Sequence, residues 1–431
     1  MASKPFHLAW FLGNSFGVHG WKDPWGGRTA LDWASPSLQI DLARAAERAC
    51  MDFVFFEDSV FVPDNYGSSM DFYLKRALRA PKNDPMPLVP LVAQATRHIG
   101  IIPTISTSFY PPYLLARLMA TLDLMSEGRV GCNFVTSTAA RAAQNFGLDE
   151  HIDHDTRYEM ADEFVEVVKK LWTSWDADAI VADEERAVFA EPGKVRTIDF
   201  EGRFFKSRGP LNTARPPQGT PVLAQAGGSP QGRAFAARHM DVVIAAVSTV
   251  QEMKAYRQDL RQRAARNGRD PDHIKVMFQV MPLFGDTDQQ AREHLARHRA
   301  GQDPAKMLAA MGSLFDIDFS TFDLDAPLAE LTTNGQQGTL KRFLSYGRTL
   351  REIAGNFTFG LENIAGTPES VASQLAELME EVGGDGFVIA GPMTRRYIAE
   401  VTDGLAAVLQ RRGLTRERYT HRHFRDHLME F

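Results

Sequence analysis

The sequence predicts an α/β protein, a (β/α)8 TIM barrel with insertions after some of its strands. Two observations lead to this fold. Short, nearly continuous apolar runs recur along the 431 residues, and amphipathic stretches with helical spacing follow several of them. Strands that are buried on both faces have this composition, and their alternation with helices is typical of a parallel barrel. We therefore expect a single barrel domain over residues 1–431.

Eight apolar runs are the candidate barrel strands, which is the number that a closed barrel of this type requires. In chain order they are Phe6–Leu12, Phe53–Phe56, Ile99–Ser106, Val130–Thr136, Pro221–Ala226, Val242–Val247, Ile274–Phe284 and Phe387–Ala390. The clearest helices between them are Leu38–Ala49, Leu114–Ser126, Tyr158–Trp175 and Val371–Val382.

Two stretches do not fit this repeat. Residues 177–220 are rich in Asp and Glu and then in Pro and Gly, and residues 301–367 lie between the last two strands. The second stretch contains a helical piece near Leu340–Glu352. We interpret both as insertions after barrel strands, which would cap the face of the barrel where the strands end.

Composition excludes several classes of protein. The net charge of −6 argues against a nucleic-acid partner, because phosphate binding needs a basic face. Two cysteines, Cys50 and Cys132, are too few for a disulfide framework or a Cys-rich metal site and suit a reducing cytoplasm. The N-terminal residues lack the pattern of a signal peptide, and no run of 18 apolar residues occurs. We therefore expect a cytoplasmic protein without a membrane segment.

Polar side chains stand where several predicted strands end. Asp58 follows the second strand, Thr104 lies in the third, and Thr136 and Ser137 end the fourth. An acid in this place could simply cap the next helix, and hydroxyls suit strand edges. However, the carboxyl ends of barrel strands are also where ligands bind. The residues alone leave both interpretations open.

His154 and Tyr158 are one helical turn apart at the start of a long amphipathic stretch. Residues at i and i+4 face the same way, and both of these side chains can donate hydrogen bonds to phosphate oxygens. His151 and His154 also suggest a metal pair, but no third ligand follows at metal-site spacing and no HExxH motif occurs. We predict no metal site.

A glycine turn followed by a helix start comes after the fifth strand. Ser229 and Pro230 have the residue types of a helix N-cap and first helical residue, and Gly227 and Gly228 precede them. This pattern can be a plain helix start, or a place where backbone N–H groups and the helix dipole bind an anion. Gln231 stands where a GxSxG elbow needs its second glycine, and no Walker or GxGxxG motif occurs.

Together these motifs resemble the flavin-dependent monooxygenases of the bacterial-luciferase superfamily, over about residues 6 to 429. The branch is that of the nitrilotriacetate, dibenzothiophene-sulfone, dimethyl-sulfide and long-chain alkane monooxygenases. The resemblance implies that His19, in an aromatic-rich segment after the first strand, lies over the reactive face of the flavin. A structural role for this histidine is the alternative. The resemblance further implies that FMN is bound by Asp58, Thr104, Ser137, His154, Tyr158, Gly228 and Ser229.

The resemblance also implies a function. A separate NAD(P)H:flavin reductase supplies reduced FMN, and one oxygen atom from O₂ enters a small heteroatom-containing or heteroaromatic substrate, often with cleavage of a C–N or C–S bond. We expect a homodimer or homotetramer. Three alternatives remain open at this point: an F420-dependent oxidoreductase of the same superfamily, a non-catalytic flavin-binding barrel and a metal-dependent hydrolase.

The chain departs from this family in two places. Cys132 occupies a position where relatives usually carry Trp, and the segment Lys306–Phe315 lacks a histidine that several relatives use near the substrate. These departures leave the substrate open. The C-terminal His421, His423 and His427 look like metal ligands, but the family ends in a similar tail, and we interpret this tail as structural.

Overall fold

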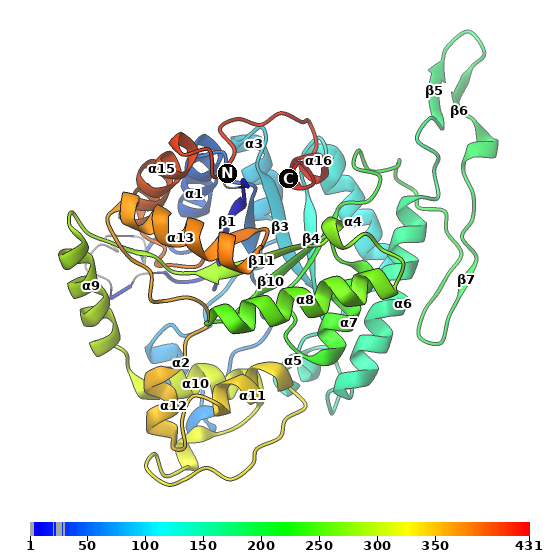
Figure 1. Ribbon diagram of the computed structural model, residues 1–431. Coiled ribbons are helices and arrows are strands. Elements are labelled where there is room, and N and C mark those ends of the chain that lie inside the picture. The colour runs from blue at the N-terminus through cyan, green and yellow to red at the C-terminus, as the bar shows by residue number, and fades with distance from the viewer. Residues whose placement is uncertain (1–3, 20, 23–27, 29–30) are drawn as a thin grey trace.

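The computed structural model describes residues 4–19, 21–22, 28 and 31–431. Eight parallel strands close into a barrel, and their order around it is β1-β14-β11-β10-β9-β4-β3-β2 (Figure 1). These strands are β1 His7–Leu12, β2 Phe53–Phe56, β3 Gly100–Ser106, β4 Gly131–Val135, β9 Val222–Gln225, β10 Val242–Ala245, β11 Lys275–Val280 and β14 Gly386–Ile389. Seven of them lie within predicted runs, and β14 begins one residue before the predicted run Phe387–Ala390. The predicted fold class is therefore confirmed.

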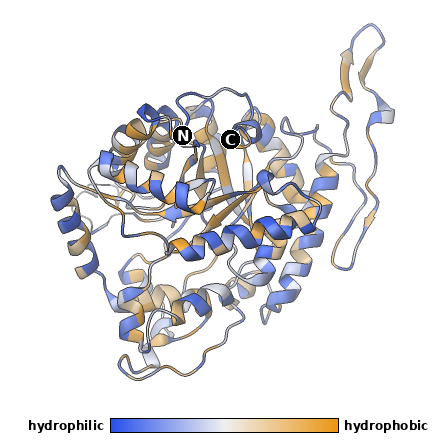
Figure 2. Ribbon diagram, in the orientation of Figure 1, coloured by the Kyte–Doolittle hydropathy of each residue, from blue (hydrophilic) through white to orange (hydrophobic). Residues whose placement is uncertain are grey.

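The barrel strands are buried on both faces, which explains why their sequences are apolar without alternation. One set of side chains fills the inside of the barrel and includes Ala9, Phe55 and Ile102. Their neighbours Leu8, Val54 and Ile101 belong to a larger cluster between the strands and the surrounding helices. Figure 2 shows the apolar strands at the centre and helices whose polar residues face outward.

Helices surround the barrel and connect its strands. The main ones are α1 Ser37–Arg48, α3 Leu88–Ala95, α4 Pro112–Met125, α6 His154–Trp172, α7 Pro230–His239, α8 Val250–Arg266, α9 Asp288–Ala300 and α13 Pro368–Val382. After β14 come α14 Arg395–Ala399, a π-helical turn Glu400–Leu405 and α15 Ala406–Arg411. Shorter elements on the connections are η1 Tyr66–Ser68, α2 Asp71–Lys75, α5 Ala140–Asn145 and η3 Pro271–His273.

The seventh predicted strand is too long. β11 ends at Val280, and Leu283–Phe284 form a separate strand, β12, which pairs with β13, Ala365–Gly366. Pro282 lies between them, and a proline has no N–H to continue a ladder of hydrogen bonds. The apolar composition continues past the end of the strand, and composition alone could not locate the break.

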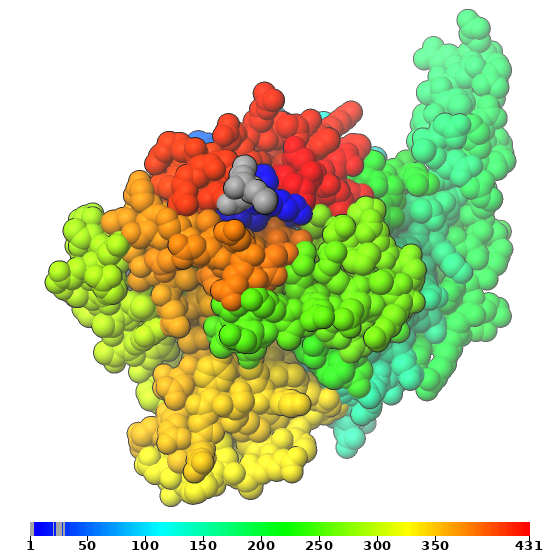
Figure 3. All heavy atoms as spheres, in the orientation of Figure 1, coloured from blue at the N-terminus to red at the C-terminus, as the bar shows by residue number. Residues whose placement is uncertain are grey.

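The first insertion forms an arm that stands away from the barrel (Figures 1 and 3). It contains two small hairpins, made of β5 Ile180–Asp183 with β6 Val188–Ala190 and of β7 Phe200–Glu201 with β8 Lys206–Ser207, and the turn η2 Pro192–Lys194. Its base is held along α6, where the Glu163 carboxylate accepts backbone N–H groups of Arg203, Phe204 and Phe205. The prediction that this insertion caps the catalytic face is therefore wrong, because the arm packs on the outer side of a helix.

The second insertion forms a lid, which we define as residues 304–356. It contains α10 Pro304–Phe315, η4 Phe319–Thr321, α11 Gln337–Leu344 and α12 Leu350–Asn356, and it has a hydrophobic core of its own. The predicted helical piece is thus two helices. Between them Gly347 packs so tightly that a Cβ would lie 2.6 Å from the Cβ of Glu352. The lid contacts the ends of several strands: Tyr346 bonds Ser248 after β10, and Asp318 accepts the Gly67 N–H after β2.

The C-terminal tail closes the opposite end of the barrel. Phe424, in α16 Phe424–Leu428, lies so close to the starts of β3 and β4 that a Cβ on Gly100 would be 2.6 Å from its ring. Arg416 joins the tail to the buried Asp52, which also binds His7. The interpretation of the tail as structural is confirmed. In the described part of the chain, no helix is both long and apolar enough to cross a membrane.

Candidate active site

The predicted site residues lie along one arc of the barrel rim. β1, β2, β3, β4 and β9 are consecutive neighbours in the closed barrel. His19, Asp58, Thr104, Ser137 and Ser229 lie at or after the carboxyl ends of these five strands, in the same order. His154 and Tyr158 come from α6, which follows β4. The sequence therefore predicted a set of residues that the fold places on one face.

The starts of α6 and α7 meet at Tyr158. Its ring lies 5.2 Å from that of His154, as the spacing of four predicts. Burial raises the pKa of the Tyr158 phenol, and hydrogen bonding to Ser229, Thr136 and Gln225 opposes that rise. Four polar side chains, from the ends of β4 and β9 and the starts of α6 and α7, thus converge on one buried point.

Ser229 caps α7, because its Oγ accepts the Gly232 N–H at 3.0 Å. The simple interpretation of a helix cap is therefore correct. It does not exclude ligand binding, since Pro230 has no N–H and the N–H groups of Gly228 and Ser229 precede the cap. A Cβ on Gly228 would meet no atom within 4 Å, so there is open space beside this helix start. A helix N-terminus next to open space is suited to a phosphate.

His154 has one ring nitrogen, Nε2, that is available to a ligand. Its Nδ1 binds the Asp155 carboxylate at 2.7 Å, and the other Asp155 oxygen accepts the Gln231 amide of α7. His154 is buried, and its Nε2 forms no hydrogen bond within the described residues. The Asp155 carboxylate therefore orients the imidazole and ties the two helices together.

Thr104 does not present a free hydroxyl. It donates to the Phe56 carbonyl at 2.7 Å and accepts the Asn133 amide at 2.9 Å. This arrangement turns the Oδ1 of Asn133 away from any partner, although the atom is buried. The Oε1 of Gln225 is also buried and has no hydrogen bond. These two buried oxygens, on the neighbouring strands β4 and β9, can therefore accept N–H groups of a ligand.

Ser137 is held in a strained conformation. Its φ is 52°, in the left-handed region that non-glycine residues rarely adopt, and its Oγ donates to Ser106 Oγ at 2.8 Å. Ser108 donates to the Thr136 carbonyl at 2.7 Å. These bonds fix the loops after β3 and β4 relative to each other, and strain of this kind is common at ligand sites.

His19 is buried after β1, and its Nε2 donates to the Ser15 carbonyl at 3.1 Å. Burial lowers the pKa of His19, so the ring is neutral at pH 7 and its Nδ1 is an acceptor. Ser15 is itself fixed, because its Oγ donates to the carbonyl of Glu57. The histidine is therefore rigid and neutral.

Asp58 lies beside a buried lysine that the sequence analysis did not single out. Lys82 binds Glu57 at 2.6 Å and Ser59 at 3.1 Å. Burial raises the pKa of Asp58 to about 7, the charge of Lys82 opposes this rise, and Glu57 adds to it. Near pH 7 this carboxyl can accept or donate a proton.

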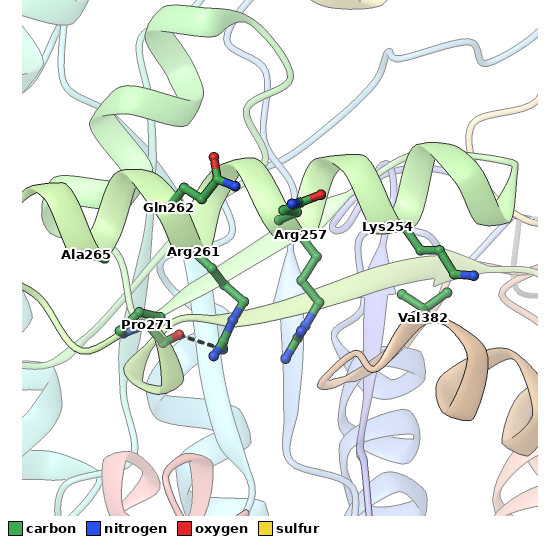
Figure 4. Close-up of a pocket in the computed structure, with 8 residues that line it drawn as sticks. Lys254, Arg257, Arg261, Gln262, Ala265, Pro271 and Val382 are labelled. Atoms are coloured by element: carbon green, nitrogen blue, oxygen red, sulfur yellow. Dashed lines mark hydrogen bonds between the residues drawn. The ribbon is translucent and has the colours of Figure 1, made fainter.

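No group of three His, Cys, Asp or Glu side chains that could hold a metal ion occurs in the described part of the chain. His151 packs its ring on Phe109 instead, and burial lowers its pKa to about 4. A separate hollow of about 430 Å³ lies on the flank of α8 (Figure 4). Its Lys254, Arg257 and Arg261 already bind acids, and it is not on the arc described above.

The sequence motifs did not indicate Asn133, Gln225 or Lys82. Asn133 and Gln225 carried a signal, because each is a polar residue in an otherwise apolar strand. Cys132, which stands where relatives usually carry Trp, does not line the candidate site. Cys132 belongs to the layer between the strands and the helices, whereas its neighbour Asn133 bonds Thr104.

Comparison with known proteins agrees with this geometry. A sequence model described as luciferase-like monooxygenase matches residues 19–386. The chain is 36% identical over 440 residues to the dibenzothiophene-sulfone monooxygenase of Rhodococcus erythropolis (strain XP), which covers 99% of this chain and 96% of that protein. It is 35% identical over 444 residues to the nitrilotriacetate monooxygenase component A of Aminobacter aminovorans, with 99% and 97% covered.

A solved structure of similar shape is that of a riboflavin lyase with modified FMN and its substrate riboflavin. The TM-score is 0.92 at 31% identity, and the match covers 99% of this chain and 96% of that one. The similarity to these proteins extends over the whole barrel and both insertions. The chain belongs to the luciferase-like monooxygenase family and is an enzyme of the flavin-dependent monooxygenase class, as the sequence predicted.

Proposed function

We propose that this chain is the oxygenase component of a two-component system. It binds reduced FMN made by a separate reductase and inserts one oxygen atom from O₂ into a small organic substrate that contains a heteroatom or a heteroaromatic ring. The observation that carries the proposal is the convergence of His154, Tyr158 and Ser229 at the starts of α6 and α7, beside open space at Gly228.

The residues present fit FMN. Gly228, Ser229, Tyr158 and His154 would hold the phosphate through N–H and O–H donors. The unpartnered oxygens of Asn133 and Gln225 would accept N–H groups of the flavin ring. Bound reduced flavin supplies the electrons that activate O₂, and the protein supplies binding and orientation. Thr104 and Ser137 would act mainly by fixing Asn133 and the loop after β4.

His19 and Asp58 are the candidate proton-handling groups of the site. The neutral His19 ring would hold or move a proton at Nδ1, since Nε2 is bound to Ser15. Asp58 would contact the flavin, and its carboxyl titrates near neutral pH. The lid, which bonds Ser248 after β10, would help to exclude water from the site.

An apolar substrate suits the surroundings of the site. Val60 and Val62 follow β2 and are exposed, and the Val60 carbonyl accepts the Asn145 amide of α5. Next along the chain, the exposed Phe146 stacks on Phe109, which follows β3, at 4.3 Å. Exposed apolar side chains that gather near a ligand site favour apolar or aromatic ligands. Cleavage of a C–N or C–S bond after oxygen insertion remains part of this proposal.

We further infer a homodimer or homotetramer in the cytoplasm. Tyr113, Leu114, Leu124 and Met125 are exposed on the single helix α4, and a patch of this kind favours a protein interface. Size-exclusion chromatography with light scattering would test the assembly. The two free cysteines, Cys50 and Cys132, are compatible with a reducing compartment.

The test of this proposal gives the chain NADH alone and then NADH together with a flavin reductase. We expect the purified chain to oxidise NADH negligibly by itself, because it has no dinucleotide fingerprint. Adding FMN and any flavin reductase should start substrate-dependent O₂ uptake with a member of a panel of sulfones, sulfides, aminopolycarboxylates and N-heterocycles. Rapid NADH oxidation by the chain alone would contradict the two-component proposal. O₂ uptake that no substrate changes would favour a flavin-binding barrel without catalysis.

A further inference from the structure

Arg157 is a fully buried cation without a carboxylate partner in the described part of the chain. It is 0% exposed, and burial lowers its pKa to about 10. The nearest acids are used elsewhere: Asp153 caps α6 and Asp155 binds His154. A buried arginine normally pairs with an acid, because removing its charge from water costs several kcal/mol.

The bonds of Arg157 all lead to the start of α6 and to the lid. Its Nη1 donates to the Ile152 carbonyl at 2.5 Å, and its Nη2 donates to the Asn334 carbonyl at 2.6 Å. The Nε is buried and has no partner. Two backbone carbonyls and the more distant Asn334 side-chain oxygen are an incomplete environment for a guanidinium, which has five N–H donors.

Asn334 joins the lid to the same helix. Its side-chain oxygen accepts the His154 backbone N–H at 2.8 Å and is 3.4 Å from Arg157 Nη1. The lid therefore provides a cap for α6, the helix that carries His154 and Tyr158. Opening the lid would leave the His154 N–H and the Arg157 guanidinium without these acceptors.

Four residues further on, the lid touches the start of α7. A Cβ on Gly338 would lie 2.8 Å from both the Gly228 carbonyl carbon and the Ser229 nitrogen. Gly338 is in the first turn of α11, so the N-termini of α6, α7 and α11 meet at one place. Three helix N-termini and an arginine without an ion pair favour an anion at this place.

We propose that Arg157 is a positioning residue that locks the lid segment Asn334–Gly338 over the phosphate site, so that phosphate binding and lid closure stabilise each other. The inference rests on the proposed function, because the anion is the phosphate of the flavin. A dianion beside Ser229 compensates the charge of Arg157, and the charged Arg157 in turn holds Asn334. FMN closes the lid, whereas riboflavin, which lacks the phosphate, leaves it free to open.

Hydrogen–deuterium exchange of the whole chain with oxidised FMN or with riboflavin tests this coupling without turnover. FMN should slow exchange in residues 333–344 at least roughly 10-fold more than riboflavin does, as expected for one hydrogen bond to a charged group. Arg157→Met should remove this difference. Asn334→Ala keeps the backbone carbonyl that binds Arg157 but loses the bond to the His154 N–H, so it should reduce the difference. The control Tyr346→Phe breaks a lid contact on the other side, with Ser248, and should speed exchange equally with both flavins.

Equal protection by FMN and riboflavin in the unaltered chain would overturn the inference, as would FMN-specific protection that survives in both variants. If Arg157→Met does not fold, Asn334→Ala still tests the inference, because it changes the lid side of the contact and leaves the buried arginine in place. A flavin titration on the same samples separates the two proposals. If FMN binds without protecting the lid, only the coupling through Arg157 is contradicted. If FMN does not bind, the proposed function is contradicted as well.

Discussion

Tyr158 and Gly232 pack so closely that the phenol occupies the space of a Cβ on Gly232. That Cβ would lie 2.8 Å from the Tyr158 hydroxyl oxygen. Gly232 is in the first turn of α7 and Tyr158 is in α6, so this contact brings the starts of the two helices together. The candidate phosphate site therefore depends also on Gly232, three residues after Ser229, because a side chain there would displace the phenol.

Gly232→Ala should displace the Tyr158 hydroxyl and weaken FMN binding roughly 10-fold, the loss expected for one hydrogen bond to a charged phosphate. Gly193→Ala is a matched control, because a Cβ there would meet no atom within 4 Å. Fluorescence titration of both variants with FMN measures the effect. An affinity of Gly232→Ala equal to that of the control would remove Tyr158 from the site.

Tyr158→Phe and Ser229→Ala should each weaken binding of reduced FMN by about 1–2 kcal/mol. They should differ in stability, since Ser229 also caps α7 and its loss costs about 1 kcal/mol of unfolding free energy. Anaerobic flavin titration and urea unfolding measure the two effects separately. Unchanged affinity in both variants would mean that the phosphate binds elsewhere.

The sequence was sufficient for the barrel because each strand is buried on both faces. Runs such as Phe53–Phe56 and Val242–Ala245 are apolar throughout, and amphipathic helical stretches separate them along the chain. The place of the arm was not predictable in the same way. It depends on Glu163 accepting three N–H groups about 40 residues further along the chain, and composition does not report such a contact.

The candidate site was predictable where its residues are local in sequence. His154 and Tyr158 share one helical turn, and Ser229 and Pro230 form a cap that can be recognised from four residues. Arg157 and Asn334 are separated by 177 residues, and nothing in either segment indicates that they bond. The role of the lid therefore required the structure.

Asp58→Asn should stabilise the flavin-free protein at pH 8 and have little effect near pH 4. The folded-state pKa of Asp58 is about 7, above its value of 3.8 in the unfolded chain. Between these values the folded protein binds more protons, so Asp58 lowers stability as the pH rises through this window. We expect a gain of about 1–3 kcal/mol at pH 8.

Urea unfolding of both proteins at pH 4 and pH 8 measures the Asp58 effect. The flavin-free chain is required because a bound flavin would change the environment of the carboxyl. A gain that is the same at both pH values would show that the substitution acts through packing and not through the buried charge.

His19→Ala should leave the affinity for reduced FMN nearly unchanged, because the phosphate contacts come from α6 and α7. It should lower product formation per flavin consumed while H₂O₂ release rises, since a positioned proton donor contributes about 10²–10⁴ in rate. His294→Ala is a suitable control. That histidine also bonds a carbonyl, of Phe284, but lies on α9 away from the arc. Coupling equal to that of the control would leave His19 with a structural role only.

Oxygen transfer from O₂ is the central claim, and isotope labelling tests it most directly. The complete chain would be incubated with FMN, a flavin reductase, NADH and ¹⁸O₂, with the panel member that stimulates O₂ uptake as substrate. The account predicts one ¹⁸O atom in each product molecule. It also predicts that no labelled product forms when the reductase is omitted. Product that carries oxygen from water, or product that forms without the reductase, would contradict it.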